Sequence, residues 1–166
     1  MKKSLLFLGM MLAVVACSTT KLTPQEKAQQ RAQEIQQVNK NIQNRHFSID
    51  IDYMYPQQGP ARRVDFGYFL AVHGDTLNSG LPYFGRAYQV PYGGGKALNF
   101  ETKLSSYNAY RVKNGLMRVE IKAQNEEDQY YYTLDIYDNG KTDITVLARE
   151  RDQIRFSGTM NLDKKK

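Results

Sequence analysis

The stretch YYYTLDIYDNGKTDITV, residues 130–146, decides the fold class, because two strand patterns flank a turn signal within it. If Asn139-Gly140 formed a two-residue turn, the apolar side chains of the two strands would lie on opposite faces. A three-residue loop with Gly140 in the left-handed conformation brings them onto one face, pairing Ile136 with Thr142, Leu134 with Ile144 and Tyr132 with Val146. The stretch therefore predicts a β-hairpin with a G1 bulge.

Two further hairpins are expected on either side of this one. Asn114-Gly115 is typical of a two-residue type I′ turn. The expected register there pairs Val112 with Met117, Tyr110 with Val119 and Asn108 with Ile121. A last turn over residues 150–152 is expected to pair Ala148 with Ile154 and Val146 with Phe156.

Towards the N-terminus the same period of two continues. Polar residues alternate with Phe47, Ile49, Ile51 and Tyr53, which predicts a strand with one solvated face. Residues 64–72 predict a second strand, and Gly74-Asp75 a tight turn into a short third strand around Leu77. The fold class is mainly β (α+β): residues 46–162 form an antiparallel meander of about eight to ten strands, curled as an open sheet or closed as a lipocalin-like barrel.

An amphipathic helix is expected before the strands, over residues 24–45. Thr23-Pro24-Gln25-Glu26 has the pattern of a helix start, with a Thr N-cap, Pro at the first position and Glu in the capping-box position. A narrow apolar face follows at Ala28, Ala32, Ile35, Val38 and Ile42. The helix either packs along the domain or stands as a stalk.

The first sixteen residues have the pattern of a processing segment. Lys2 and Lys3 precede an apolar run of 12 residues, which is too short to span a bilayer. The tetrapeptide Val14-Val15-Ala16-Cys17 resembles the lipobox of bacterial lipoproteins. That resemblance implies a signal peptide over residues 1–16, acylation of Cys17, and residues 17–23 as a lipidated tether.

Lipidation would place the protein in the cell envelope, with the membrane as its partner through Cys17. Ser18 rather than Asp follows the cysteine, which by analogy with Gram-negative sorting favours the outer membrane. The periplasmic and the surface side both remain open. Because Cys17 is the only cysteine, the mature chain would have no disulfide and no thiol nucleophile.

Charge argues against nucleic acid as a partner. The 166 residues contain 23 basic and 17 acidic residues, a formal net charge of +6. Removal of residues 1–16 takes two lysines and no acid, and Lys164, Lys165 and Lys166 lie in a basic tail over residues 163–166. A nearly neutral domain with a basic tail lacks the one-sided basic face of a nucleic-acid binder.

No catalytic set is recognisable, and we expect no cofactor. His46, Ser48, Asp50 and Asp52 share one strand face, but the alternation of a solvated strand accounts for them without a metal. A hydrolytic triad would have to use His46 or His73. Gly93-Gly94-Gly95-Lys96 is followed by an extended pattern rather than by the helix of a phosphate loop.

Twelve tyrosines and no tryptophan are the strongest compositional signal. Three of them lie in Leu81-Pro82-Tyr83-Phe84-Gly85-Arg86-Ala87-Tyr88 and Pro91-Tyr92-Gly93, within a long ordered loop or irregular edge. This block resembles the signature of small bacterial lipoproteins known as domain of unknown function 4251. The similarity extends from Phe47 to Leu162 and implies a lipid-anchored envelope protein without an established activity.

The leading hypothesis is a non-catalytic ligand- or partner-binding β-domain that uses Tyr83, Phe84, Arg86, Tyr88 and Tyr92. The alternative is that Tyr83, Phe84 and Tyr88 form a plug at one end of a barrel. A second hypothesis is an assembly role, in which the N-terminal helix docks on an outer-membrane complex. A hydrolase is the third.

Overall fold

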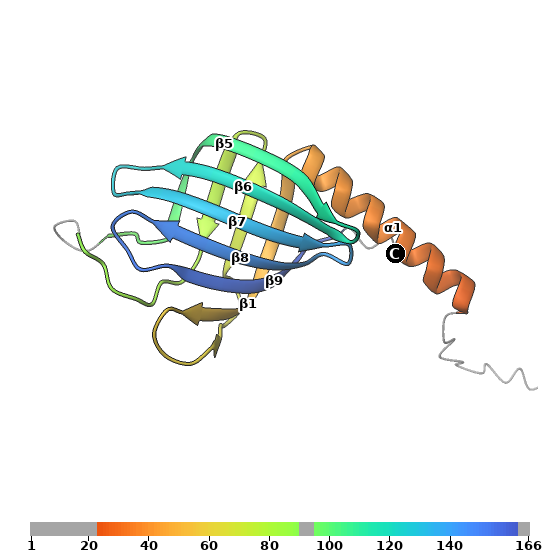
Figure 1. Ribbon diagram of the computed structural model, residues 1–166, viewed down its shortest axis with the longest axis horizontal. Coiled ribbons are helices and arrows are strands. Elements are labelled where there is room, and N and C mark those ends of the chain that lie inside the picture. The colour runs from red at the N-terminus through yellow and green to blue at the C-terminus, as the bar shows by residue number, and fades with distance from the viewer. Residues whose placement is uncertain (1–22, 90–94, 163–166) are drawn as a thin grey trace, which may run out of the picture.

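The computed structural model describes residues 23–89 and 95–162, which form one helix and nine strands (Figure 1). The elements are α1 (Pro24–Gln43), β1 (His46–Pro56), β2 (Arg62–Arg63), β3 (Phe69–His73), β4 (Thr76–Gly80), β5 (Asn99–Lys113), β6 (Leu116–Gln124), β7 (Gln129–Tyr137), β8 (Lys141–Ala148) and β9 (Ile154–Met160). The segment 1–16, Cys17, Tyr92 and the tail 163–166 lie outside the described residues.

The strands close into a barrel because β1 pairs with β9 as well as with β3. Consecutive strands from β3 to β9 are antiparallel neighbours, and the two-residue β2 pairs with β1 outside the ring, so the ring has eight strands. Gly158 permits the closure, since a Cβ there would collide with the carbonyl oxygen of Asp50 on β1. The predicted antiparallel β-domain is confirmed, in its closed form.

The barrel interior is a packed hydrophobic core. A ring of eight strands is just wide enough for side chains to fill. Three adjacent tyrosines illustrate the alternation: Tyr130 and Tyr132 are fully buried, whereas Tyr131 faces solvent. The largest buried side chains besides these two tyrosines are Phe156, Ile42, Ile49, Leu70, Leu77, Leu98, Ile121, Leu134, Ile136 and Ile144.

Strand β1 departs from the predicted alternation at Asp52. Ile51 points inward as predicted, but the register against β9 shifts between Ile51 and Tyr53. This bulge adds one residue, so Tyr53 is 43% exposed and Met54 takes the buried position. The expectation that Tyr53 continues the inward set is therefore wrong, because an alternating pattern does not reveal a bulge.

The central hairpin, β7–β8, has the predicted register. Ile136 pairs with Thr142, Leu134 with Ile144 and Tyr132 with Val146. Gly140 has φ +79°, and its N–H donates to the Tyr137 carbonyl at 2.8 Å. This confirms the prediction that Gly140 adopts the left-handed conformation, which was based on matching the apolar faces of the two strands.

The register of β5–β6 differs from the prediction by one residue. Asn114-Gly115 does form the turn between Lys113 and Leu116, but the pairing shifts between Arg111 and Lys113. Ala109 therefore pairs with Val119, in place of the expected Tyr110, and Tyr107 pairs with Ile121. Tyr110 and Val112 face solvent, at 39% and 45% exposure.

The β8–β9 hairpin is shifted by two residues: Val146 pairs with Ile154 and Ile144 with Phe156. A register shift of two residues keeps the same side chains pointing inward, so the predicted core residues of these strands are unaffected. The error lies in the predicted length of the connection between the strands. The longer connection, residues 149–153, contains Arg151 and Asp152, which become important at the barrel end.

The predicted strand over residues 64–72 is wrong in its first half. Residues 64–68 form a turn between β2 and β3, in which Gly67 has φ +102° and the Phe66 side chain is fully exposed. The bend lets β1 pair with β3 along residues 46–50 and with β2 at residues 53–54. The prediction around Leu77 is confirmed as β4.

Helix α1 begins as predicted and projects from one end of the barrel (Figure 1). The capping box is present: the Thr23 hydroxyl accepts from the Glu26 N–H and the Glu26 carboxylate from the Thr23 N–H. Val38 and Ile42 belong to the barrel core, whereas residues 24–33 are exposed. The C-terminal half thus packs on the barrel and the N-terminal half stands clear of it. Nowhere in the described residues is there a helix both long and apolar enough to cross a membrane.

A candidate binding site at the end of the barrel

The described parts of the segment between β4 and β5, residues 81–89 and 95–98, lie at the end of the barrel opposite α1 (Figure 1). Both ends of the segment are fixed in the core, since Leu81 and Leu98 are buried and the Leu81 N–H donates to the Leu98 carbonyl at 3.2 Å. Its described first part has irregular structure and one β-bridge, from Ala87 to Arg151. The predicted irregular loop is therefore attached to the β8–β9 connection.

Asp152, in that connection, holds the loop at several points. Its carboxylate accepts hydrogen bonds from the Tyr88 hydroxyl at 2.6 Å and from the Arg86 backbone N–H at 3.2 Å. The Asp152 N–H donates to the Arg86 carbonyl at 3.0 Å, and the Tyr83 hydroxyl donates to the same carbonyl at 2.6 Å. A Cβ at Gly85 would lie 2.7 Å from the Tyr83 hydroxyl oxygen, so glycine lets the loop fold closely over that ring.

These hydrogen bonds and the burial of the loop shift the pKa values of Asp152, Tyr88 and Tyr83. The Tyr88 hydroxyl, followed by the Arg86 backbone N–H, holds the pKa of Asp152 below its usual 3.8. The same hydrogen bond raises the pKa of Tyr88 above 10.0, because ionised tyrosine would lose its proton bond to the carboxylate. Burial is the main cause of the raised pKa of Tyr83. At neutral pH the carboxylate is thus an acceptor and both phenols are donors.

Aromatic and cationic side chains project from this framework into solvent. Phe84 is 46% and Tyr88 66% exposed, and the Arg62 guanidinium stacks 4.1 Å from the centre of the Phe84 ring. A hollow of about 280 Å³ lies beside them, lined by Gln58, Tyr83, Phe84, Gly85, Arg86 and Asp152. Arg86 is exposed on its rim.

Of the aromatic residues expected to plug the end of the barrel, only Tyr83 does so. Tyr83 is half-buried and packs against the hydrophobic core, as a plug would. Phe84 and Tyr88 are exposed, so they do not close the barrel. The structure brings Tyr83, Phe84 and Arg86 to one hollow, with Tyr88 bonded to its Asp152 wall, whereas Tyr92 is outside the described residues.

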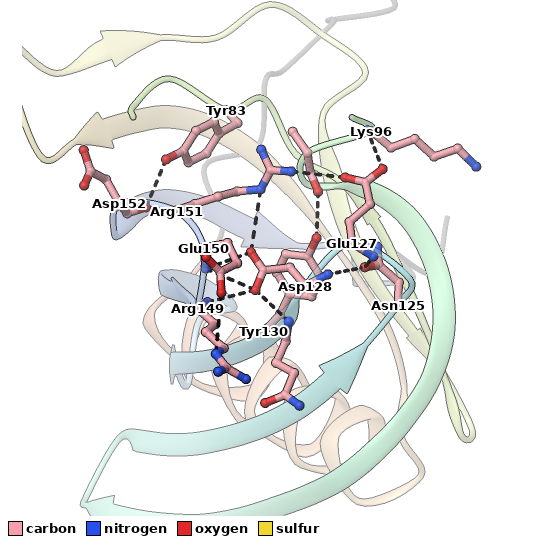
Figure 2. A network of polar contacts seen from close by, with 12 residues as sticks. Tyr83, Lys96, Asn125, Glu127, Asp128, Tyr130, Arg149, Glu150, Arg151 and Asp152 are labelled. Atoms are coloured by element: carbon pink, nitrogen blue, oxygen red, sulfur yellow. Dashed lines mark hydrogen bonds and ion pairs between the residues drawn. The ribbon is translucent and has the colours of Figure 1, made fainter. Parts of the chain in front are cut away.

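Beneath the loop, a polar network closes this end of the barrel (Figure 2). The Asp128 carboxylate is 1% exposed and accepts from the backbone N–H groups of Gln129, Arg149 and Glu150 at 2.7 to 3.3 Å. The buried Arg151 guanidinium donates to Glu127 at 3.1 Å, and its Nε lies 3.8 Å from an Asp128 oxygen. Figure 2 shows Arg151 extending between Tyr83 and these two carboxylates.

Sequence reasoning missed this network. Asn125 could have indicated a turn, because its side-chain oxygen accepts from the N–H groups of Glu127 and Asp128. The partnership of Arg151 with two acids 23 and 24 positions earlier has no periodic signal, since it depends on two connections meeting at one barrel end. The network matters for the site because Arg151 and Asp152 are neighbours.

A second hollow, also missed from the sequence, lies on the outer surface over β1, β8 and β9. It has a volume of about 650 Å³ and contains the exposed rings of Tyr53 and Tyr137. Its charged lining residues are Asp52, Asp138, Asp143 and Lys141. The two hollows differ in charge: this one is mainly acidic, whereas arginines flank the first.

Two other polar residues singled out on β1 have contacts of their own. Asp50 accepts from the Asn161 amide, and Asp52 lines the second hollow. Within residues 23–89 and 95–162, no three His, Cys, Asp or Glu side chains are grouped closely enough to hold a metal ion. Residues 99–113 continue as β5, so no helix follows the glycine run to bind phosphate.

Comparison with known proteins identifies the family. The family model described as "Domain of unknown function (DUF4251)" matches residues 29–160. The chain belongs to the DUF4251 family. A crystal structure of a DUF4251 protein from Bacteroides eggerthii has a TM-score of 0.60 and 12% identity, over 78% of this chain and 87% of that one. No curated protein matches the sequence.

Family membership confirms the resemblance found in the sequence. At 12% identity, the solved structure supports the barrel and carries no information about a ligand. The activity of this DUF4251 protein has to be argued from its own surface.

Proposed function

We propose that this DUF4251 protein is a lipid-anchored protein of the outer membrane that binds an anionic ligand or partner group through the loop 81–88. The observation that carries the proposal is an exposed set of aromatic and guanidinium groups on a rigid framework. Phe84 and Tyr88 remain exposed although the backbone beneath them is bonded to Asp152.

Rigidity is the reason to favour binding over a passive surface loop. A binding segment that is already ordered loses less conformational entropy when it binds. Asp152 and the bridge between Ala87 and Arg151 supply this order, and the buried network below fixes Arg151. Exposed aromatic and arginine side chains are also the types that contribute most at binding hot spots.

The guanidinium groups define the chemistry of the ligand. Arg62 lies against Phe84, and Arg86 lines the adjacent hollow. A planar guanidinium binds carboxylate or phosphate in bidentate geometry, and an aromatic face beside it accepts a flat ring or an apolar stem. A ligand with a carboxylate or phosphate group next to an apolar moiety fits this surface.

The N-terminal segment would place the loop far from the membrane. Acylation of Cys17 would leave residues 17–23 as a tether, followed by the 20 residues of α1, about 30 Å of helix. The loop lies at the barrel end opposite α1, so an anchor before α1 would present it away from the lipid.

Binding is tested by titrating the full-length protein, purified in detergent, with citrate and pyrophosphate and following amide shifts by NMR. We expect the amides of residues 81–88 to shift, and the Arg86→Gln and Phe84→Ala variants to lose about tenfold in affinity or more. Tyr53→Ala is the matched control, because Tyr53 is equally exposed but lies in the acidic hollow. Shifts that persist in both loop variants, or no shifts with either anion, would contradict an anion-binding loop.

Anchoring is tested separately by the Cys17→Ala variant. The wild type should fractionate with membranes and incorporate labelled fatty acid, and the variant should lose both properties. A wild type that incorporates no labelled fatty acid would exclude the lipid anchor without affecting the binding proposal.

A second function, assembly with an envelope complex, is favoured by the exposed half of α1. Residues 24–33 pack against nothing in the barrel, and their apolar face includes Ala28 and Ala32. Deleting residues 24–33 leaves Val38 and Ile42 in the core, so the barrel should remain folded. Loss of co-purifying partners in this deletion, with the loop variants unaffected, would support assembly over ligand binding.

A further inference from the structure

The two histidines of the chain lie side by side at the α1 end of the barrel. His46 is the first residue of β1 and His73 the last residue of β3, and they are direct cross-strand partners. Their Nδ1 atoms are 3.3 Å apart and share a hydrogen bond in which either ring can be the donor. The ring centroids are 4.7 Å apart with an interplanar angle of 63°. Both side chains are exposed to solvent.

This separation matches the bite of a tetrahedral metal ion. With Zn–N bonds of about 2.0 to 2.1 Å and a tetrahedral angle, two imidazole nitrogens on one Zn²⁺ lie about 3.3 Å apart. We propose that His46 and His73 chelate a divalent transition-metal ion, Zn²⁺ in the first place, through their Nδ1 atoms. Solvent or an external ligand would complete the coordination, since a third protein ligand is absent from the described surroundings.

The backbone beneath the pair is fixed, so chelation needs no rearrangement of the strands. The Gly74 N–H donates to the Arg45 carbonyl at 2.8 Å, and the Arg45 guanidinium bonds to the Asp75 carboxylate at 2.9 Å. These contacts tie the residues that flank each histidine to one another. Only the ring torsions must change, so that both lone pairs point to a common position, and these torsions are soft for exposed histidines.

The charge around the pair permits a cation. Asp75 neutralises Arg45, the nearest cation in sequence, and the Arg45 guanidinium also lies 4.9 Å from the centre of the Tyr107 ring. Imidazole nitrogen suits Zn²⁺, Cu²⁺ and Ni²⁺, whereas Mg²⁺ and Ca²⁺ prefer oxygen ligands. The site is independent of the proposed function, because the loop 81–88 lies at the opposite end of the barrel.

The test is a Zn²⁺ titration of the full-length protein in detergent, without a polyhistidine tag, followed by imidazole NMR signals. Because the chain has two histidines, each signal is assigned by one variant, His46→Gln or His73→Gln. We expect both imidazoles to shift together over one range of Zn²⁺ concentration. Each single variant should bind more weakly by a factor on the order of ten or more, since a chelate loses its intramolecular second ligand.

Asp75→Asn is the matched control, because it alters the same turn and leaves both imidazoles in place. Its Zn²⁺ affinity should stay within about twofold of the wild type, as expected if the carboxylate is not a ligand. A shift of one imidazole alone, no shift, unchanged affinity in both glutamine variants, or a tenfold loss in Asp75→Asn would overturn the proposal. The wild-type titration decides by itself if a variant fails to fold.

Discussion

At the α1 end of the barrel the closing side chains are apolar, and at the loop end they are charged. Val38 and Ile42 complete the core at the first end, where the Tyr107 hydroxyl also donates to the Ile42 carbonyl at 2.8 Å. At the second end, Arg151 and Asp128 are buried under an exposed loop. Apolar closure is insensitive to pH and tolerant of small shifts, whereas buried charges require each partner in place.

The way in which each end of the barrel is closed determines whether it is suited to binding. An end held by directional bonds keeps its surface residues in fixed positions, as a binding surface requires. At the other end, two apolar residues of α1 fix only the C-terminal half of this helix on the barrel. The predictions below test this contrast, from the largest expected effect to the smallest.

Asp128→Ala should cause the largest loss of stability. The substitution leaves the buried Arg151 without one of its two acids and removes the acceptor of three backbone N–H groups. Removing one partner of a buried ion pair costs about 3–5 kcal/mol. Urea denaturation measures the loss. Glu126→Ala, an exposed acid in the same turn, should have little effect, and an equal loss there would contradict the network.

Ile42→Ala should destabilise the opposite end by about 2–5 kcal/mol, because Ile42 is fully buried. Ile35→Ala is the matched control two turns earlier on the same apolar face. Ile35 is half-buried, so its truncation should cost about 1 kcal/mol. Equal losses in urea denaturation would show that the helix packs on the barrel as tightly at Ile35 as at Ile42.

The loop end should respond to both acid and base. A lowered pKa of Asp152 means that its contribution is present above the usual 3.8 and is lost as pH falls through the folded-state value. A raised pKa of Tyr88 means that its contribution is present below 10.0 and is lost as pH rises through the folded-state value. Loop order should therefore persist between these limits.

The Arg86 amide signal in NMR measures this order, and Asp152→Asn removes the charged acceptor. We expect the acid transition of the loop to disappear in that variant, while signals of Val38 and Ile42 in the second half of α1 remain unchanged in both proteins. An acid transition that persists in Asp152→Asn would assign it to another group.

Thr23→Ala should have the smallest effect. It removes the capping hydroxyl of α1, so the first turn should fray and its amides should exchange faster with solvent. The first half of the helix contacts no core residue, so global stability in urea should not change measurably. A cooperative loss of barrel stability would mean that the exposed half of α1 belongs to the folding unit.

Much of the fold could be predicted because it depends on local patterns. The helix start at Thr23 follows from the capping box, and the β7–β8 register follows from matching apolar faces across Gly140. The errors at Tyr53 and Tyr110 share one cause. A bulge changes the phase of a strand by one residue, and its position is decided by the neighbouring strands.

The candidate site likewise contains some residues that the sequence identified and others that only the structure revealed. The sequence identified Tyr83, Phe84, Arg86 and Tyr88 as an unusual block, through composition and family resemblance. It could not identify Asp152 as their common partner or Arg62 as the neighbour of Phe84, because 22 or more positions separate each pair. It also treated His46 and His73 separately, although strand pairing places them in contact.

By itself, then, the sequence determined the helix, the antiparallel strands and the inward face of most of them, because each follows from neighbours a few residues apart. The tertiary structure alone decided that β1 meets β9, that Arg151 reaches Asp128, and which tyrosines face solvent. Closure of the barrel joins residues about a hundred positions apart, and contacts over such distances leave no period in the chain that forms them.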